Sequence, residues 1–349
     1  MLRRPLRRRA GFSLVEVLVA IFILAAGLLA LFTLFPLGAV QMGKALRDDR
    51  SQQCALQADG KVREWWRAQV VEGTPVGPTS PSVVPCVAAL DSGAAGFPAQ
   101  PAAAGRASYP VLLDPIGFAS YAGHPKQLTV AGVASFPRRT LTIGGAAPVP
   151  IGFPAVLPIA GLADSMEFAP DGTPADRDGL AVTATGQPIF RTWRQNWAAV
   201  IQRPDNATRG LADLKILVFD QRVPGRNPIA PVNNEQAYSV AVAVGSNQVL
   251  FPAPATNDQL GLRQGSWVMD GTIQVDGTGN GIRNAQFYQV NSVAEIAGGV
   301  LVELVNPILP PRGEGAPASY TAQLYVLNDL IDVYDRPQLT PSGYSKQTP

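Results

Sequence analysis

Residues 11–35 read GFSLVEVLVAIFILAAGLLALFTLF, and this stretch decides how the chain is organised. From Val17 to Phe35, nineteen consecutive residues carry no charge, and only Gly27 and Thr33 among them are not plainly apolar. At a rise of about 1.5 Å per residue, a helix of this length spans roughly 28 Å, close to the hydrocarbon core of a bilayer. The stretch therefore predicts a transmembrane helix, which we assign to residues 12–36.

The charges near this stretch are strongly asymmetric. Five arginines precede it without any acidic residue among them: Arg3, Arg4, Arg7, Arg8 and Arg9. Basic residues on one flank of a span place that flank in the cytoplasm. Without these arginines the chain would carry 23 basic against 26 acidic residues, a net charge of −3. Because the body of the chain has no basic stripe with interleaved aromatic residues, we expect no nucleic-acid partner.

Three simpler interpretations of the N-terminus are a secretory signal peptide, a twin-arginine signal and a plain membrane anchor. A secretory apolar region is about 7 to 15 residues long and leads into a small-residue cleavage site. The stretch here is longer and runs into Leu34, Phe35 and Pro36. A plain anchor leaves Glu16 unexplained, because an acidic side chain beside the bilayer core is costly and is usually functional.

The segment GFSLVEVLVA at residues 11–20 resembles the cleavage and methylation motif of type IV prepilins and type II secretion pseudopilins. The resemblance covers about residues 8–36 and is closest to PilV-like minor pilins. It implies that a prepilin peptidase cuts between Gly11 and Phe12, and that the new amine of Phe12 is then methylated. Glycine at position 11 suits this cleavage, because glycine readily adopts the extended backbone that binding in a peptidase cleft requires. Residues 1–11 are accordingly expected to be a basic prepilin leader.

The resemblance also implies a role for Glu16 in assembly. After cleavage, the Phe12 amine would lie four residues from Glu16 on the same helical face. In the family, this carboxylate is thought to meet the amine of a neighbouring subunit in the filament. The expected location is the bacterial inner membrane, with the N-terminus cytoplasmic and the head periplasmic or extracellular, and later the pilus or pseudopilus. The expected partners are prepilin peptidase, other pilins or pseudopilins, and the membrane.

The rest of the chain predicts an α+β fold, in which a long N-terminal helix precedes a loop-rich, antiparallel β head. Residues 37–72 read as an amphipathic helix, with apolar residues spaced by three and four: Ala55, Ala58, Val62, Trp65, Trp66 and Val70. We expect the helix to bend or melt at Thr33–Pro36, because a proline removes a helical hydrogen bond. We favour a core position for the tryptophan pair over a place in a membrane-interface belt.

Composition divides the chain beyond the helix into three parts. Residues 73–110 are rich in Pro, Gly, Ala and Ser and read as a connector or surface insertion. Residues 111–335 form the predicted head. Its strand signals are firmest from Leu214 on, in LKILVF, SVAVAV, WVMDGTIQV, QFYQVNSVA, VLVELV and YTAQLYVLNDLIDVY. Residues 336–349 are polar and read as a flexible tail.

The chain offers little chemistry. It contains a single histidine, His124, which is too few for a metal site built from several histidines and makes a Ser-His-Asp catalytic triad improbable. We therefore expect no enzyme activity, no cofactor and no metal site. Cys54 and Cys86 are the only cysteines and could form a disulfide in an oxidising compartment. Two unpaired thiols are the alternative.

Two further functions stay open beside assembly. The head could be a filament-borne adhesin or substrate-docking module, with Trp193, Trp197 or Trp267 as candidate binding residues. A membrane-anchored enzyme is the third hypothesis.

Overall fold

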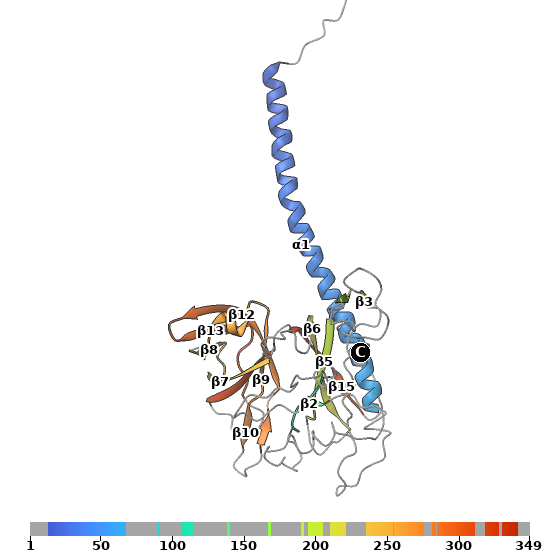
Figure 1. Cartoon of the computed structure of the whole chain (residues 1–349), viewed down its shortest axis with the longest axis vertical. Coiled ribbons are helices and arrows are strands. Elements are labelled where there is room, and N and C mark those ends of the chain that lie inside the picture. Colours follow the sequence, from blue (N-terminus) through green and yellow to red (C-terminus); the bar gives the residue numbers. More distant parts are fainter. Residues whose placement is uncertain are drawn as a thin grey trace, which may run out of the picture. The chain divides into compact units, whose positions relative to one another are not determined.

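The structure is a computed structural model of the whole chain (Figure 1). It describes residues 13–67, 90, 107–114, 138–139, 167–168, 190–191, 195–204, 210–220, 235–253, 255–275, 281–283, 285–310, 318–327 and 330–340. The chain divides into two compact units, Met1–Arg50 and Ser51–Pro349, and each is described by itself.

One helix, α1 (Leu14–Trp66), accounts for 53 residues. It begins after Ser13, whose Oγ accepts a hydrogen bond from the backbone N–H of Glu16 at 3.2 Å. The helix runs through Pro36 without interruption, so the melt expected at Thr33–Pro36 is wrong. A proline removes one backbone donor, and the hydrogen bonds of the neighbouring turns are enough to continue the helix. Residues 68–72, the expected end of the amphipathic helix, lie outside the described residues.

The strands form two larger sheets and two short pairs. The order is β15-β6-β5-β1-β2 in the five-stranded sheet and β7-β14-β9-β12-β13-β8 in the six-stranded sheet, and the short pairs are β10-β11 and β3-β4. The strands are β1 (Val111–Leu113), β2 (Arg138–Arg139), β3 (Glu167–Phe168), β4 (Phe190–Arg191), β5 (Gln195–Gln202), β6 (Ala212–Asp220), β7 (Glu235–Ala243), β8 (Gln248–Pro252), β9 (Trp267–Asp270), β10 (Ile273–Val275), β11 (Gly281–Arg283), β12 (Gln286–Ile296), β13 (Gly299–Leu304), β14 (Ser319–Leu327) and β15 (Leu330–Leu339).

Almost all of the described pairings are antiparallel. The exception is β1 with β2, which is parallel. The predicted order of a helix followed by an antiparallel β-rich region is therefore confirmed, and each strand signal from Leu214 on corresponds to one or two strands. The short helix α4 (Asn257–Leu260) follows β8 and is capped by Thr256.

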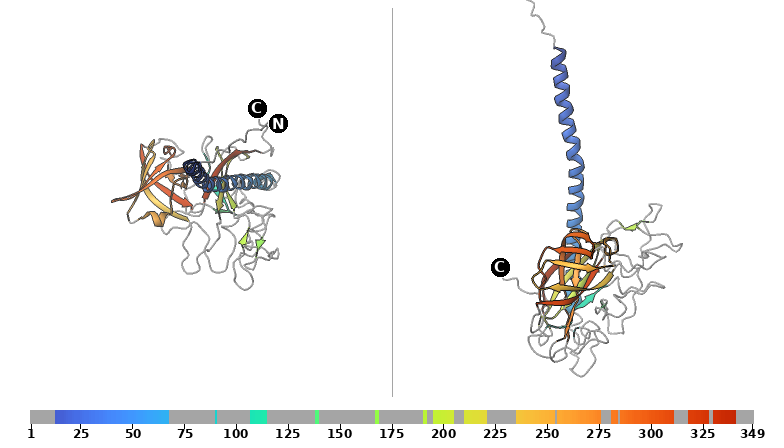
Figure 2. Two further views of the ribbon diagram at one scale, coloured as in Figure 1. Left: turned by 90° about the horizontal axis from the view of Figure 1, so that it is seen from above. Right: turned by 90° about the vertical axis from the view of Figure 1, so that its left-hand side faces the viewer.

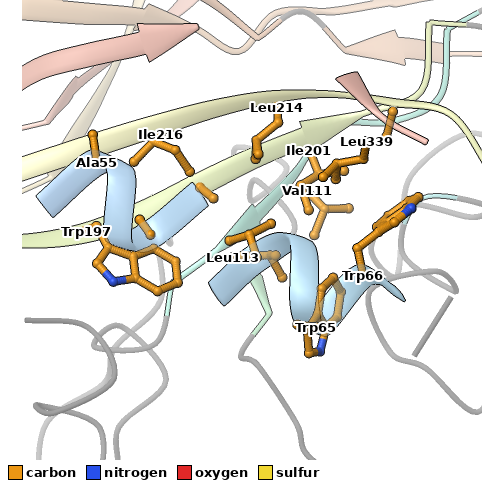
Figure 3. Close-up of a cluster of buried hydrophobic side chains, with 14 of the residues drawn as sticks. Ala55, Trp65, Trp66, Val111, Leu113, Trp197, Ile201, Leu214, Ile216 and Leu339 are labelled. Carbon is orange, nitrogen blue, oxygen red and sulfur yellow. The ribbon is translucent and has the colours of Figure 1, made fainter. Parts of the chain in front are cut away.

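The central strand β5 of the five-stranded sheet is buried on both faces, and its alternate residues serve the two sides. Trp197, Ala199 and Ile201 pack with the last turns of α1 in one cluster, which Figure 3 shows. Ala198 and Val200 pack in a second cluster with side chains of β9 and β14. This alternation is the period of two expected for a strand. The second unit is thus layered as helix, five-stranded sheet and six-stranded sheet.

The six-stranded sheet curls around an apolar interior of its own. Its edge strands, β7 and β8, lie at opposite ends of the strand order but contact each other and are joined by residues 244–247. These strands face the viewer in the right-hand view of Figure 2. The interior holds buried side chains from β7, β8, β9, β12, β13 and β14, together with Leu260, Leu262 and Ile308.

Two predicted boundaries need correction. The tail was expected from residue 336, but Arg336–Leu339 belong to β15 and pair with β6, and Leu339 is 1% exposed. Part of the predicted connector is core, because Leu90 is fully buried against α1 and residues 107–110 are buried as well. In both places a few apolar side chains in polar or proline-rich sequence fill gaps in the core, which composition alone does not reveal.

The turn between β12 and β13 generates a stability prediction. Gly299 has φ +134°, and a Cβ at this position would lie 2.0 Å from the carbonyl oxygen of Phe251. Gly299→Ala should therefore lower the free energy of unfolding by more than about 2 kcal/mol, through backbone strain and overpacking. Urea unfolding of the full chain in detergent, followed by tryptophan fluorescence, measures the change.

The neighbouring glycine is the matched control. A Cβ on Gly298 would find only the Leu250 Cδ2 atom, at 3.9 Å. Gly298→Ala should stay within about 1 kcal/mol of the wild type, in the range of ordinary surface substitutions. Equal losses in the two variants would contradict the packing described around Gly299.

Candidate functional site

The N-terminal segment of α1 carries the residues for which a function was predicted. Gly11 and Phe12 lie outside the described residues. Glu16 lies in the first helical turn, and its side chain is exposed. Ser13 was not predicted as a site residue, yet it caps the helix by accepting the Glu16 N–H at 3.2 Å. The spacing Ser-x-x-Glu before an apolar run is a known capping signal and could have revealed it.

Large apolar side chains surround this part of the helix on every side. Leu14 and Val15 are 77% and 67% exposed, and Phe22 is 75% exposed. Successive helical residues are about 100° apart, so this run of exposed residues has no polar face. The other exposed large apolar side chains as far as Phe32 are Val17, Leu18, Val19, Ile21, Ile23, Leu24, Leu28, Leu29 and Phe32 itself. A helix that is apolar all round needs an apolar environment.

Among the residues whose side chains the structure describes, no helical stretch is long and apolar enough to cross a membrane.

Within the second unit, the last turns of α1 are joined to β15 by polar bonds as well as by the core. Arg63 forms an ion pair with Asp59, with Nε and Oδ1 2.9 Å apart, and donates to the carbonyl oxygens of Pro337 and Gln338. The Ser51 hydroxyl is hydrogen-bonded to the Tyr334 hydroxyl. These bonds join both ends of the buried helical segment to β15.

The tryptophans considered as binding residues are used by the core where they are described. Trp197 is fully buried, and the half-buried Trp267 donates its Nε1–H to the carbonyl of Ile331 at 3.2 Å. Trp193 lies outside the described residues. The expected core position of Trp65 and Trp66 is confirmed, since both belong to the cluster between α1 and the sheet.

Metal-ligating side chains do not gather in the described part of the chain. No group of three or more His, Cys, Asp and Glu residues there could hold a metal ion, and His124 lies outside it.

Cys54 is a free thiol, fully buried between α1 and the sheet. The disulfide considered with Cys86 is thus not formed in this structure, and Cys86 itself lies outside the described residues. Burial raises the pKa of the Cys54 thiol to about 12, and the charge of Lys61 opposes this shift. Burial in turn lowers the pKa of Lys61. Because the thiolate is the reactive form, Cys54 is chemically protected in the folded chain.

This environment predicts how Cys54 reacts. With no reductant present, iodoacetamide at neutral pH should leave Cys54 unmodified in the native chain and modify it fully in denaturant. At each pH below the raised pKa of the thiol, the native chain should react more slowly at Cys54 than the denatured chain, because less of the thiol is ionised. Peptide mass spectrometry measures the modification, with Cys54→Ala as the blank. If the denatured chain reacts at Cys54 only after reduction, Cys54 is bridged and the free thiol is wrong.

Comparison with known proteins bears on the N-terminal segment alone. Residues 6–32 match the family model described as the prokaryotic N-terminal methylation motif. No curated protein and no solved structure matches the chain. The matched residues include Gly11, Phe12 and Glu16, the positions that the sequence resemblance singled out. The chain therefore carries a prepilin-type N-terminal methylation motif, of the kind found in type IV pilins and pseudopilins, in residues 6–32.

Proposed function

We propose that this protein is a minor pilin or minor pseudopilin, a processed inner-membrane protein that assembles into a type IV pilus or a type II secretion pseudopilus. The observation that carries the proposal is the methylation motif at residues 6–32, placed on a helix whose apolar side chains are uncovered. The proposed role is structural and involves no catalysis.

The exposed apolar side chains supply the driving force for insertion and assembly. Moving a large aliphatic or aromatic side chain out of water contributes about 1.5 to 3 kcal/mol. Lipid would cover these side chains before assembly, and the helices of neighbouring subunits would cover them afterwards. The arginines before residue 10 would hold the N-terminus in the cytoplasm, where prepilin peptidase acts.

In the proposed filament, Glu16 would make the contact between neighbouring subunits specific. Cleavage after Gly11 creates a cationic amine on Phe12, close in sequence to an exposed carboxylate in the first turn of α1. Inside a filament, the amine of one subunit would neutralise Glu16 of the next. Removing one partner of such a buried pair leaves an uncompensated charge, which costs about 3 to 5 kcal/mol.

The size of the second unit favours a minor or tip component over a repeated shaft subunit. That unit spans Ser51–Pro349 and contains two layered sheets. A body of this volume on every subunit would crowd helical packing along a filament. The closer likeness to PilV-like minor pilins stays a prediction.

Processing gives the first test of the proposal. When the full chain is co-expressed with a prepilin peptidase, its intact mass should fall by residues 1–11 and rise by one methyl group. The new N-terminus should be N-methylated Phe12. Gly11→Leu, which puts a bulky side chain before the bond to be cut, should leave the mass unshifted. A wild-type chain that still begins at Met1 would refute the proposal.

Assembly gives the second test. Glu16→Ala should leave cleavage and membrane insertion intact but reduce incorporation into filaments by about tenfold or more, because the Phe12 amine loses its partner. The matched control is Asp48→Ala, an exposed acidic residue on the same helix beyond the apolar run. Quantitative immunoblotting of sheared filaments measures incorporation. Normal incorporation of Glu16→Ala would rule out the charge pair.

A further inference from the structure

Three neighbouring strands of the six-stranded sheet, β12, β13 and β8, present an outer face that the fold does not fully cover (Figure 1). In β8, Val249 and Phe251 are buried in the apolar interior, and the residues between and beside them are exposed. In β13, the half-buried Leu301 and Glu303 alternate with fully buried residues. Because side chains of a strand point to opposite faces in turn, Leu301 and Glu303 lie on the outer side.

Apolar side chains gather on this face near the turn between β12 and β13. Leu301 pairs with Leu250 of β8 and with Ala294 of β12, so these three side chains lie side by side. Ile296 follows at the end of β12. Leu250 is 40% exposed and Ile296 is 46% exposed.

Val305 extends the outer face beyond the other end of β13. The N–H of Leu304 donates to the Asn247 carbonyl at 2.6 Å, and the N–H of Val305 donates to the Gln289 carbonyl of β12 at 2.8 Å. Since these N–H groups point to opposite neighbours, the backbone is still extended and Val305 faces the same way as Glu303. Three of the five exposed large apolar side chains described in the second unit therefore lie on this face: Leu250, Ile296 and Val305.

A carboxylate, that of Glu303, lies between the two apolar parts of the face. Its cross-strand neighbours, Gln248 and Ser292, are uncharged. Its Oε2 accepts hydrogen bonds from the Ser292 hydroxyl at 2.9 Å and from the Asn291 side-chain amide at 3.2 Å. These bonds hold the carboxylate in place and use both lone pairs of Oε2, so Oε1 is the oxygen left for a partner.

The strands around Glu303 supply no cation of their own. β8, β12 and β13 contain no lysine, arginine or histidine, and their charged residues are Glu295 and Glu303. Residues 235–327 contain three arginines and no lysine against seven acidic residues, a net charge of −4. A half-buried carboxylate beside apolar side chains attracts a cation, and the attraction strengthens when a contact displaces the surrounding water.

We propose that this outer face docks a partner protein through a lysine flanked by apolar side chains. Lysine fits better than arginine, because a guanidinium binds a carboxylate best through both oxygens, whereas an ammonium needs only one. The lysine would donate to Oε1 of Glu303. Its apolar neighbours would cover Leu250 and Ile296 on one side and Val305 on the other. This contact of the head is additional to the contacts of α1 proposed above.

Carbodiimide crosslinking tests the contact, because it joins a carboxylate to an amine where the two touch. Membranes from the cells that make the full chain are treated at neutral pH, and mass spectrometry identifies the crosslinked peptides. Glu303 should be joined to a lysine of a different protein, with apolar residues next to that lysine. Glu303→Gln should abolish this product, although its amide oxygen can still accept the bonds from Ser292 and Asn291. Glu295→Gln is the matched control and should keep the product, because the Glu295 carboxylate binds the Asn257 N–H instead, at 2.8 Å.

The affinity for the partner identified in this way gives a second readout. Titrated with that partner, the full chain in detergent should bind about tenfold more weakly as Glu303→Gln, which loses a charged hydrogen bond. Leu250→Ser should bind about 3- to 10-fold more weakly, because it loses apolar contact. The control is Leu56→Ser on α1, where the leucine is also exposed but lies elsewhere, and its affinity should equal that of the wild type.

Three results would overturn the proposal. The first is a Glu303 product joined to a lysine of another copy of this chain or to the amine of a lipid headgroup, which would make the face a self-contact or a membrane contact. The second is no Glu303 product in membranes where other exposed carboxylates of the chain are crosslinked. The third is an affinity that neither Glu303→Gln nor Leu250→Ser changes.

Discussion

The contact between the last turns of α1 and the five-stranded sheet is the interaction on which the second unit depends. To this contact the helix contributes two small side chains, Ala55 and Ala58, and two large ones at its end, Trp65 and Trp66. All four are buried, so the cluster excludes water along the last turns of the helix. Arg63 and Ser51 then bind to β15, which fixes how the helix lies on the sheet.

Because both faces of the five-stranded sheet are covered at its central strands β5 and β6, these strands have apolar residues at successive positions. In β6, Ile216, Leu217, Val218 and Phe219 are all buried, with alternate residues in the two clusters. Such a run is easy to recognise, and LKILVF of β6 was predicted as a strand on this ground. The six-stranded sheet has one covered face over much of its length and shows the alternating pattern instead, as in β8. The sequence could distinguish these strands but not their grouping into two sheets, because strand order depends on contacts between distant segments.

The failures of prediction share a physical cause. Composition suggested a connector at 73–110 and a tail from residue 336, yet Leu90 and Leu339 are both core residues. One well-placed leucine is enough to anchor a polar segment, and no window average detects it. In the N-terminal segment, a short motif was enough to single out Gly11, Phe12 and Glu16, and the family model matches residues 6–32. The capping role of Ser13 was missed although its spacing to Glu16 carries the signal.

The distribution of exposed apolar surface connects the fold to the proposed function. Fifteen of the twenty exposed large apolar side chains in the described part of the chain lie between Leu14 and Leu46 of α1. In the described part of the second unit, most large apolar side chains belong to three internal clusters. The long run of exposed apolar side chains lies on the helix that carries the methylation motif, where the proposed contacts with lipid and with other subunits would cover it.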